Sequence, residues 1–160
     1  MPAPPLVDLD SIDLSEVIAT REDMFAHLDQ RGRFALLDGI LHRDADEGVI
    51  IGFKDIRADD WWAEDHIPGR PIFPGALMIE AGAQLCSYDS GLLRSDPDDQ
   101  RFFGFGGLNA TRFRGVVEPG MRLLFIAKLH RLRSTMFTYF MQGFVERKLV
   151  FETEVIGVAI

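Results

Sequence analysis

One histidine and one glutamate flank a short segment whose residue types suit acid–base chemistry. His66 begins a loop that contains three prolines, and Glu80 lies beyond Pro74-Gly75 within a run of apolar residues. A histidine can remove a proton next to a carbonyl group, and a carboxyl group in apolar surroundings can donate one to a departing hydroxyl. A proline-rich turn before a core helix explains the prolines, but it leaves the carboxylate inside the apolar run unexplained.

The residues between this pair predict how it is held. Each proline fixes its own φ and restricts the residue before it, so the loop should be stiff and should hold His66 in place. Pro74 suits the start of a helix, and the Gly75 amide at the helix N-terminus can donate to a developing oxyanion. Two plainer readings remain open: Glu80 could be a structural carboxylate paired with the Gln84 amide or a backbone group, and His66 an ordinary loop histidine.

The elements that must position these residues follow from the hydrophobic pattern. The segment from Gly75 to about Tyr88 is apolar nearly all round, which predicts a helix buried on every side. A second, short helix should begin after Thr20 and stop near Gly32. Apolar and alternating segments predict strands over 34–42, 49–56, 102–108, 109–114, 121–132, 136–147 and 149–160. The expected fold class is α+β, with a curved antiparallel sheet of six or seven strands wrapped around one long buried central helix.

Length and composition limit the function further. The 160 residues fit a flexible N-terminal arm over 1–14, rich in Pro and Asp, and a single domain over 15–160. The net charge of −8 argues against nucleic acid as a partner. Cys86 is the only cysteine, so neither a disulfide framework nor a cysteine metal site is expected. With no signal-peptide pattern and no membrane-length apolar run, a cytoplasmic protein is expected. Seven basic residues between 101 and 133 predict either a local basic face or ordinary solvated strand faces.

The joint pattern of His66, Pro68, Gly69, Pro71, Pro74, Gly75, Glu80 and Gln84 resembles the active-site signature of a known family. That family is the (3R)-3-hydroxyacyl-[acyl-carrier-protein] dehydratases of the FabZ/FabA type, which have the hot-dog fold. The resemblance covers roughly residues 20 to 160, with further similar segments at 33–38 and 112–120. Glu80 places the chain nearer the FabZ branch, because the FabA branch usually has Asp there. Asp65 and Ile67 differ from the Gly and Phe that often flank the family's histidine.

The resemblance implies a reaction and an assembly. The reaction is dehydration of (3R)-3-hydroxyacyl thioesters to trans-2-enoyl thioesters and water, in fatty-acid or related acyl or polyketide biosynthesis. His66 of one subunit and Glu80 of the other would be the catalytic residues of a homodimer, possibly assembled as a trimer of dimers. The Gly75 amide would polarise the thioester carbonyl, with Pro74 and Gln84 in supporting positions. The resemblance implies no metal and no organic cofactor, and an acyl chain that acyl carrier protein delivers on a phosphopantetheine arm through an apolar tunnel.

Two other functions are compatible with the same scaffold. A hot-dog acyl thioesterase would also place a carboxylate on the central helix, but such enzymes usually lack the His-x-Pro-Gly loop. A non-catalytic acyl-thioester-binding subunit would keep the fold without turnover. Its support is the altered pair of residues around His66.

Overall fold

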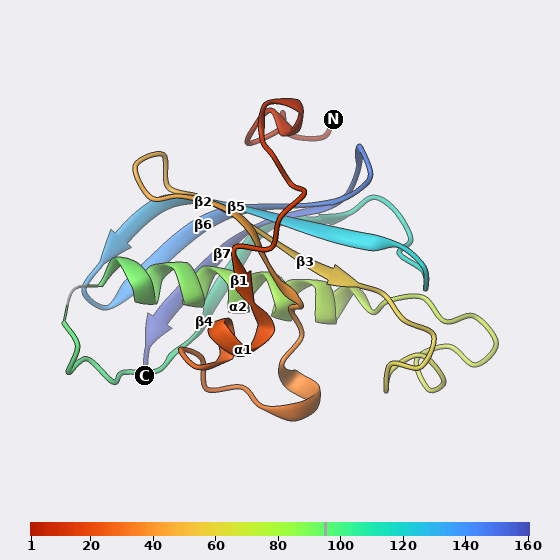
Figure 1. The fold of residues 1–160 in the computed structure, drawn as a ribbon, viewed down its shortest axis with the longest axis horizontal. Helices are drawn as coiled ribbons and strands as arrows, with labels where there is room; N and C mark the ends of the chain where they lie inside the picture. Colours follow the sequence, from red (N-terminus) through yellow and green to blue (C-terminus); the bar gives the residue numbers. More distant parts are fainter. Residues whose placement is uncertain (95) are drawn as a thin grey trace.

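A 19-residue helix, α2 (Gly75–Leu93), lies along one face of a seven-stranded antiparallel sheet in the computed structural model, which describes residues 1–94 and 96–160 (Figure 1). The strands are β1 (Ala19–Thr20), β2 (Gly39–Asp44), β3 (Val49–Asp55), β4 (Phe103–Phe113), β5 (Arg122–Arg133), β6 (Met136–Val145) and β7 (Lys148–Ala159). Short helices precede β2: η1 (Leu9–Ser11), α1 (Arg21–Phe25) and η2 (Gly32–Phe34). The predicted α+β arrangement of a sheet around a central helix is confirmed.

The strand order β1-β2-β3-β5-β6-β7-β4 makes β4 one edge of the sheet. The predicted β2–β3 hairpin is present, and β5, β6 and β7 follow one another as antiparallel neighbours. β4 pairs only with β7 among the described strands, so its other side is free. This free edge carries exposed apolar side chains at Phe105, Leu108 and Phe113.

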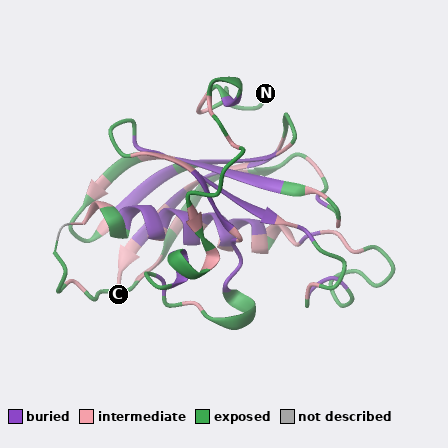
Figure 2. Ribbon diagram, in the orientation of Figure 1, coloured by how far each residue is buried: buried purple, intermediate pink, exposed green. Residues whose placement is uncertain are grey.

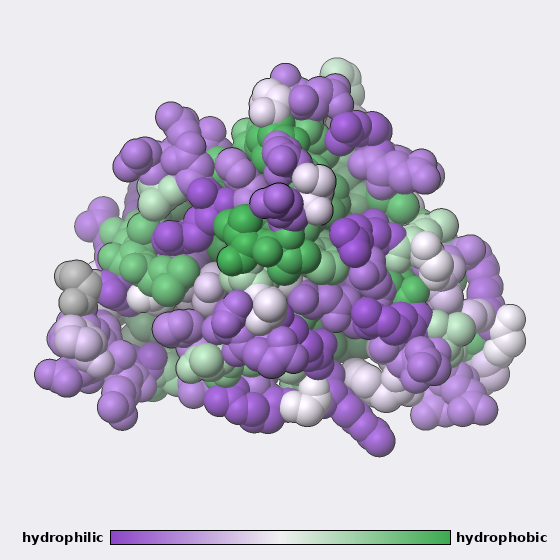
Figure 3. Space-filling model, in the orientation of Figure 1, coloured by the Kyte–Doolittle hydropathy of each residue, from purple (hydrophilic) through white to green (hydrophobic). Residues whose placement is uncertain are grey.

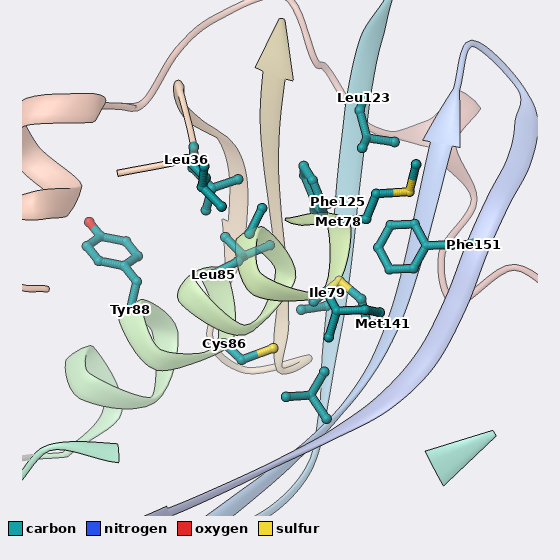
Figure 4. Close-up of a cluster of buried hydrophobic side chains, with 14 of the residues drawn as sticks. Leu36, Met78, Ile79, Leu85, Cys86, Tyr88, Leu123, Phe125, Met141 and Phe151 are labelled. Atoms are coloured by element: carbon teal, nitrogen blue, oxygen red, sulfur yellow. The ribbon is translucent and has the colours of Figure 1, made fainter. Parts of the chain in front are cut away.

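The interior of the molecule lies between α2 and the sheet, and Figure 2 shows buried residues concentrated there. Ile79, Leu85 and Cys86 of α2 belong to the same buried cluster as Phe125 and Phe151 of the sheet (Figure 4). α2 has buried residues around most of its circumference, as its all-round apolar sequence predicted. Burying this much apolar surface is the main favourable contribution to folding.

α2 extends to Leu93, five residues beyond the predicted end near Tyr88. The apolar pattern stops at Asp89, but Asp89 is 2% exposed. Its carboxylate accepts hydrogen bonds from Arg43 Nε at 2.7 Å and from Tyr139 Oη at 2.6 Å. A buried carboxylate that is paired in this way is compatible with a core helix, so the helix continues.

The segment predicted as a strand over 34–42 joins the sheet only at Gly39. Gln84 of α2 explains the difference. Its Oε1 accepts from the Leu36 amide at 3.2 Å, and its Nε2 donates to the Phe34 carbonyl at 2.7 Å. Because these backbone groups bond to a side chain of the helix, they do not take part in the β-ladder.

Two further boundaries differ from the sequence-based prediction. The strands expected over 102–108 and 109–114 form the single strand β4, with a bulge where Ala110 has φ 50°. The first helix ends at Phe25 rather than near Gly32, although Thr20 caps it as predicted and forms a capping box with Asp23.

The first residues of the chain cross the outer face of the sheet. Leu9 is buried there with Ile51 and Phe144, and the space-filling view shows apolar surface beneath the arm (Figure 3). Gln142 binds the arm through its amide, accepting from the Leu6 amide and donating to the Pro4 carbonyl, each at 2.9 Å. The division into a flexible arm over 1–14 and a domain over 15–160 stays a prediction.

Candidate functional site

The loop that carries His66 is anchored at both ends by buried aromatic side chains. Trp62 and Phe73 are each 2% exposed, and their rings meet edge to face with centroids 5.2 Å apart. Between them, the Arg70 amide donates to the Ile67 carbonyl at 2.9 Å, and Gly69 has φ 80°. This is the geometry of a turn with Pro at the second position and Gly at the third. Pro68 and Gly69 therefore form a defined turn, and the stiffness of the whole loop stays a prediction.

The His66 ring is held in one orientation by the backbone of this loop. Its Nδ1 lies 2.8 Å from the Ile72 carbonyl oxygen, while the residue itself is exposed. A carbonyl oxygen only accepts hydrogen bonds, so Nδ1 carries the proton of this contact. In the neutral ring the lone pair is then on Nε2, which is the atom available as a base.

Glu80 lies on α2 and is partly buried. Its Oε1 accepts a hydrogen bond from Gln84 Nε2 at 3.0 Å, one turn further along the helix. Gln84 is 1% exposed and also bonds to the backbone of Phe34 and Leu36. The pairing of Glu80 with Gln84 that the sequence allowed is therefore present. It fixes one oxygen of Glu80 and leaves the other without a hydrogen-bond partner within the described chain.

Gly75 is the first residue of α2, and its amide has no partner within the helix. A Cβ at this position would lie 2.8 Å from Phe113 Cε1, so the Phe113 ring packs where a side chain would be. This contact brings the end of β4 against the start of α2. The N–H group at the positive end of the helix can donate to an anionic oxygen.

A narrow cavity of about 60 Å³ opens beside Glu80. It runs along the helix face that carries Glu80, Ala83 and Ser87, and its other wall includes Phe105 and Phe137. A second cavity of about 300 Å³ shares Ser87, Phe102 and Phe103 with it. Together they follow α2 from Glu80 toward the start of β4.

Within one chain the structure brings Glu80, Gln84 and the helix start together, and it places His66 on the preceding loop. His66 and Glu80 form no hydrogen bond to each other over residues 1–94 and 96–160. Sequence reasoning did not identify the Ile72 carbonyl or the Phe34 and Leu36 backbone groups as supports of the site. Backbone groups leave no signature in residue type, so no signal in the sequence could have found them.

The sequence reasoning also missed a buried polar network on the other side of α2. Asp89 bonds to Arg43 and Tyr139, and burial together with the Asp89 charge raises the pKa of Tyr139 far above its usual range. Burial likewise raises the pKa of the Cys86 thiol. These groups face the sheet, away from the Glu80 cavity, and no role in the candidate site follows from their position.

The basic residues between 101 and 133 do not act as one free surface. Arg101, Arg114 and Arg122 pair with Asp99, Glu152 and Asp55, at distances of 2.7, 3.0 and 2.7 Å. Hydrogen bonds from Arg101 and from Arg122 lower the pKa of Asp99 and of Asp55, respectively. These three arginines are therefore paired with carboxylates and are not free to form a local basic face.

Neither a metal site nor a membrane-spanning helix is found among the described residues. No cluster of three or more His, Cys, Asp or Glu side chains is arranged to hold a metal ion. Across the described chain, no helix has the length and apolar character needed to cross a membrane.

Comparison with known proteins identifies relatives of this chain. The sequence model of the FabA-like domain matches residues 28–154. A 3-hydroxyacyl-[acyl-carrier-protein] dehydratase FabZ from Syntrophobacter fumaroxidans is 35% identical over 84% of this chain and 89% of its own length. A protein of the same name from Campylobacter jejuni is 34% identical over 79% of this chain and 88% of its own.

Solved structures share the fold at low sequence identity. The dehydratase heterocomplex ApeI:P from Xenorhabdus doucetiae matches with TM-score 0.73 and 14% identity, over 86% of this chain and 90% of that chain. A mutant of thioesterase PA1618 from Pseudomonas aeruginosa matches with TM-score 0.65 and 13% identity, over 92% and 99%. The sheet wrapped around α2 is thus the hot-dog fold that the sequence predicted. Given the family match and the FabZ relatives, the chain belongs to the FabA-like family.

Proposed function

We propose that the protein is a hydro-lyase that dehydrates (3R)-3-hydroxyacyl thioesters to trans-2-enoyl thioesters, with the acyl chain carried on acyl carrier protein. The observation that carries this proposal is the pair of fixed groups on either side of the helix start. One is a histidine whose Nδ1–H is bonded to Ile72, and the other is a carboxyl group held by Gln84. FabZ relatives at 29–35% identity support the same reaction.

His66 is proposed as the base. With Nδ1 donating to the Ile72 carbonyl, the Nε2 lone pair takes the proton from the carbon next to the thioester carbonyl. The negative charge that develops on the carbonyl oxygen is stabilised by the Gly75 amide at the start of α2. One such donor contributes about 3 kcal/mol to a transition state in comparable sites.

Glu80 is proposed as the acid. It protonates the 3-hydroxyl group as the C–O bond breaks, so that water leaves and the double bond forms between the two carbons. Gln84 acts as a positioning residue, because its Nε2–H holds one Glu80 oxygen while the other faces the reaction. The reaction needs neither a metal nor an organic cofactor, since both proton transfers use side chains.

A homodimer is proposed to complete the site. The free edge of β4, with exposed Phe105, Leu108 and Phe113, suits antiparallel pairing with a second copy of itself. Pairing about a two-fold axis near Asn109 would place the partner's Phe113 beside Phe105. The Phe113 end of β4 lies against Gly75, and Phe105 lines the Glu80 cavity. The symmetry would therefore carry the partner's histidine loop toward Glu80.

The acyl chain is proposed to enter the cavity beside Glu80, along the face of α2 that carries Ala83. The cavity beside Glu80 is bordered by Ala83, Phe105 and Phe137, which suits an alkyl chain.

A hydration assay tests the proposal. The purified protein is given a trans-2-enoyl thioester on carrier protein, and loss of enoyl absorbance is followed. We expect turnover that falls at least about 100-fold in both His66→Ala and Glu80→Gln, with folding intact by circular dichroism. Release of free thiol instead of hydration would indicate a thioesterase. Acyl-carrier binding without turnover at any chain length would indicate a non-catalytic subunit, and either result would contradict the proposal.

A further inference from the structure

A cavity of about 280 Å³ beside the candidate site is lined by four cations, Arg21, Arg33, Lys54 and Arg57. One carboxylate, Asp60, also lines it. The cations come from α1, the segment before β2, the end of β3 and the loop that leads to His66. Below, this is called the cationic cavity. Four cations converging on one cavity in a chain of net charge −8 call for a physical explanation.

The carboxylates near the cationic cavity accept only some of the hydrogen bonds that its cationic side chains can donate. Arg21 and Arg57 each approach Asp38 at 3.5 Å, and Lys54 approaches Asp60 at the same distance. Elsewhere in the chain, the guanidinium groups of Arg101 and Arg122 lie 2.7 Å from their partner carboxylates. Charge-assisted hydrogen bonds are normally about 2.7–2.9 Å long, so donors in the cationic cavity remain available to another anion.

Lys54 is the cation that most requires such an anion. Its side chain is 5% exposed, and its carboxylate contact is the long one to Asp60. A buried ammonium group loses hydration energy that only close pairing restores. A second unused donor stands in the same wall. Trp62 is 2% exposed, and its indole Nε1–H has no hydrogen-bond partner among residues 1–94 and 96–160.

The cationic cavity shares its walls with the candidate site. Leu36, in its wall, donates its amide to Gln84, which in turn holds Glu80. Trp62, in the same wall, accepts a hydrogen bond from the His66 amide at 2.9 Å. The segments that line the cationic cavity are therefore the same ones that hold the groups of the candidate site.

We propose that the cationic cavity binds the phosphate of the pantetheine arm that carries the acyl thioester. The guanidinium groups of arginine match phosphate oxygens in geometry, and Lys54 adds a point charge beneath them. The inference rests on the proposed function, because that function brings a phosphopantetheine thioester to the site. Both carrier protein and coenzyme A present this same phosphate.

Two substrates that differ only by the phosphate give the test. The same trans-2-enoyl group is offered on pantetheine and on phosphopantetheine, and the ratio of the two kcat/KM values is measured. We expect the phosphate to raise kcat/KM at least about tenfold in the unaltered protein. Arg33→Gln should lower this ratio to about one by raising the KM for the phosphopantetheine thioester, while turnover of the pantetheine thioester is unchanged.

Control variants separate this site from general charge. Arg131→Gln removes an exposed arginine of β5 far along the sheet and should leave the ratio as it was. Lys54→Met serves as a second variant within the cationic cavity. A ratio near one in the unaltered protein, or a ratio kept by both folded cavity variants, would overturn the proposal. The cavity variants could instead lose activity on coenzyme A thioesters and keep full activity on carrier-protein thioesters. That result would assign the cavity to the nucleotide phosphates of coenzyme A, and it would also overturn the proposal.

Binding without turnover keeps the two proposals separable. Trp61 and Trp62 both line the cationic cavity and are the only two tryptophans in the chain, so their fluorescence reports on it. Phosphopantetheine should give a saturable change that pantetheine does not give, weakened by salt and absent in Arg33→Gln. Such binding with no turnover on any thioester would contradict the proposed function while supporting the cavity. Turnover without a phosphate-dependent change in tryptophan fluorescence would support the proposed function and contradict the phosphate site.

Discussion

Gln84 is the residue on which the geometry of the candidate site depends most. Its amide makes three hydrogen bonds at once, to Glu80 and to the backbone of Phe34 and Leu36. Both amide hydrogens and the amide oxygen of this buried side chain therefore have a partner. The sequence indicated Gln84 only as a neighbour of the site. Its second role, which pulls the chain before β2 onto the helix, depends on residues 48 and 50 positions away and has no local signal.

Replacing Gln84 by Met should therefore affect stability and turnover separately. The Leu36 amide and the Phe34 carbonyl would lose their partner, which costs about 1–3 kcal/mol of unfolding free energy for a buried polar group. Glu80 would lose its orienting donor, so kcat should fall and the pH profile of kcat should shift. Urea denaturation and pH–rate profiles measure the two effects. Gln142→Met, which removes a buried amide that bonds to the N-terminal arm instead, is the control. An unchanged pH profile in Gln84→Met would refute the positioning role.

The contact between Gly75 and Phe113 gives a second test at this scale. A methyl group at residue 75 would lie 2.8 Å from the Phe113 ring, so Gly75→Ala should displace that ring and disturb the helix start. We expect a loss of hydration activity of roughly tenfold or more, since a misplaced oxyanion donor loses much of its value. Phe113→Ala added to Gly75→Ala should restore part of it. If the double variant is no better than Gly75→Ala, the steric explanation is wrong.

At the scale of elements, local hydrophobic periodicity predicted the long helix and most strands. Boundaries that depend on polar contacts between distant residues could not be predicted in this way. β3 and the strands β5 to β7 lie close to their predicted bounds, because their apolar patterns are local. The sequence-based prediction divided β4 into two strands at Asn109, whereas the structure has one strand with a bulge there and Ala110 at positive φ. The end of α2 was missed because Arg43 and Tyr139, 46 and 50 residues away, satisfy Asp89.

This network predicts unequal effects of its two partners. Arg43→Met would leave Asp89 as an unpaired buried charge, which typically destabilises a protein by about 3–5 kcal/mol. Tyr139→Phe would remove one neutral donor and should cost about 1–3 kcal/mol. Chemical denaturation of both variants measures the order. Equal losses would mean that the Arg43 charge does not stabilise Asp89.

At the scale of the whole molecule, ion pairs at the surface make stability depend on pH. Arg122 lowers the pKa of Asp55 below its ordinary 3.8, and Arg114 lowers that of Glu152 below its ordinary 4.5. The folded state then binds fewer protons than the unfolded state in this range, so acid favours unfolding. The stabilising effect is complete above the ordinary values and disappears as the pH falls through the lowered ones.

Thermal unfolding across this range is the corresponding measurement. The melting temperature should be level near neutral pH and should fall as the pH drops below about 5. Arg114→Gln should reduce the slope, because Glu152 would return toward its ordinary pKa. A slope identical in the variant would show that this pair does not contribute.

The assembly of the molecule gives the most direct test of the account, because one active site is proposed to take His66 from one copy and Glu80 from the other. The measurement is the hydration rate of a mixture of His66→Ala and Glu80→Gln proteins after subunit exchange has been verified. Half of the dimers would be mixed and each would hold one intact site, so about a quarter of the unaltered activity should return. If activity stays absent in proven mixed dimers, the shared site of His66 and Glu80 is contradicted.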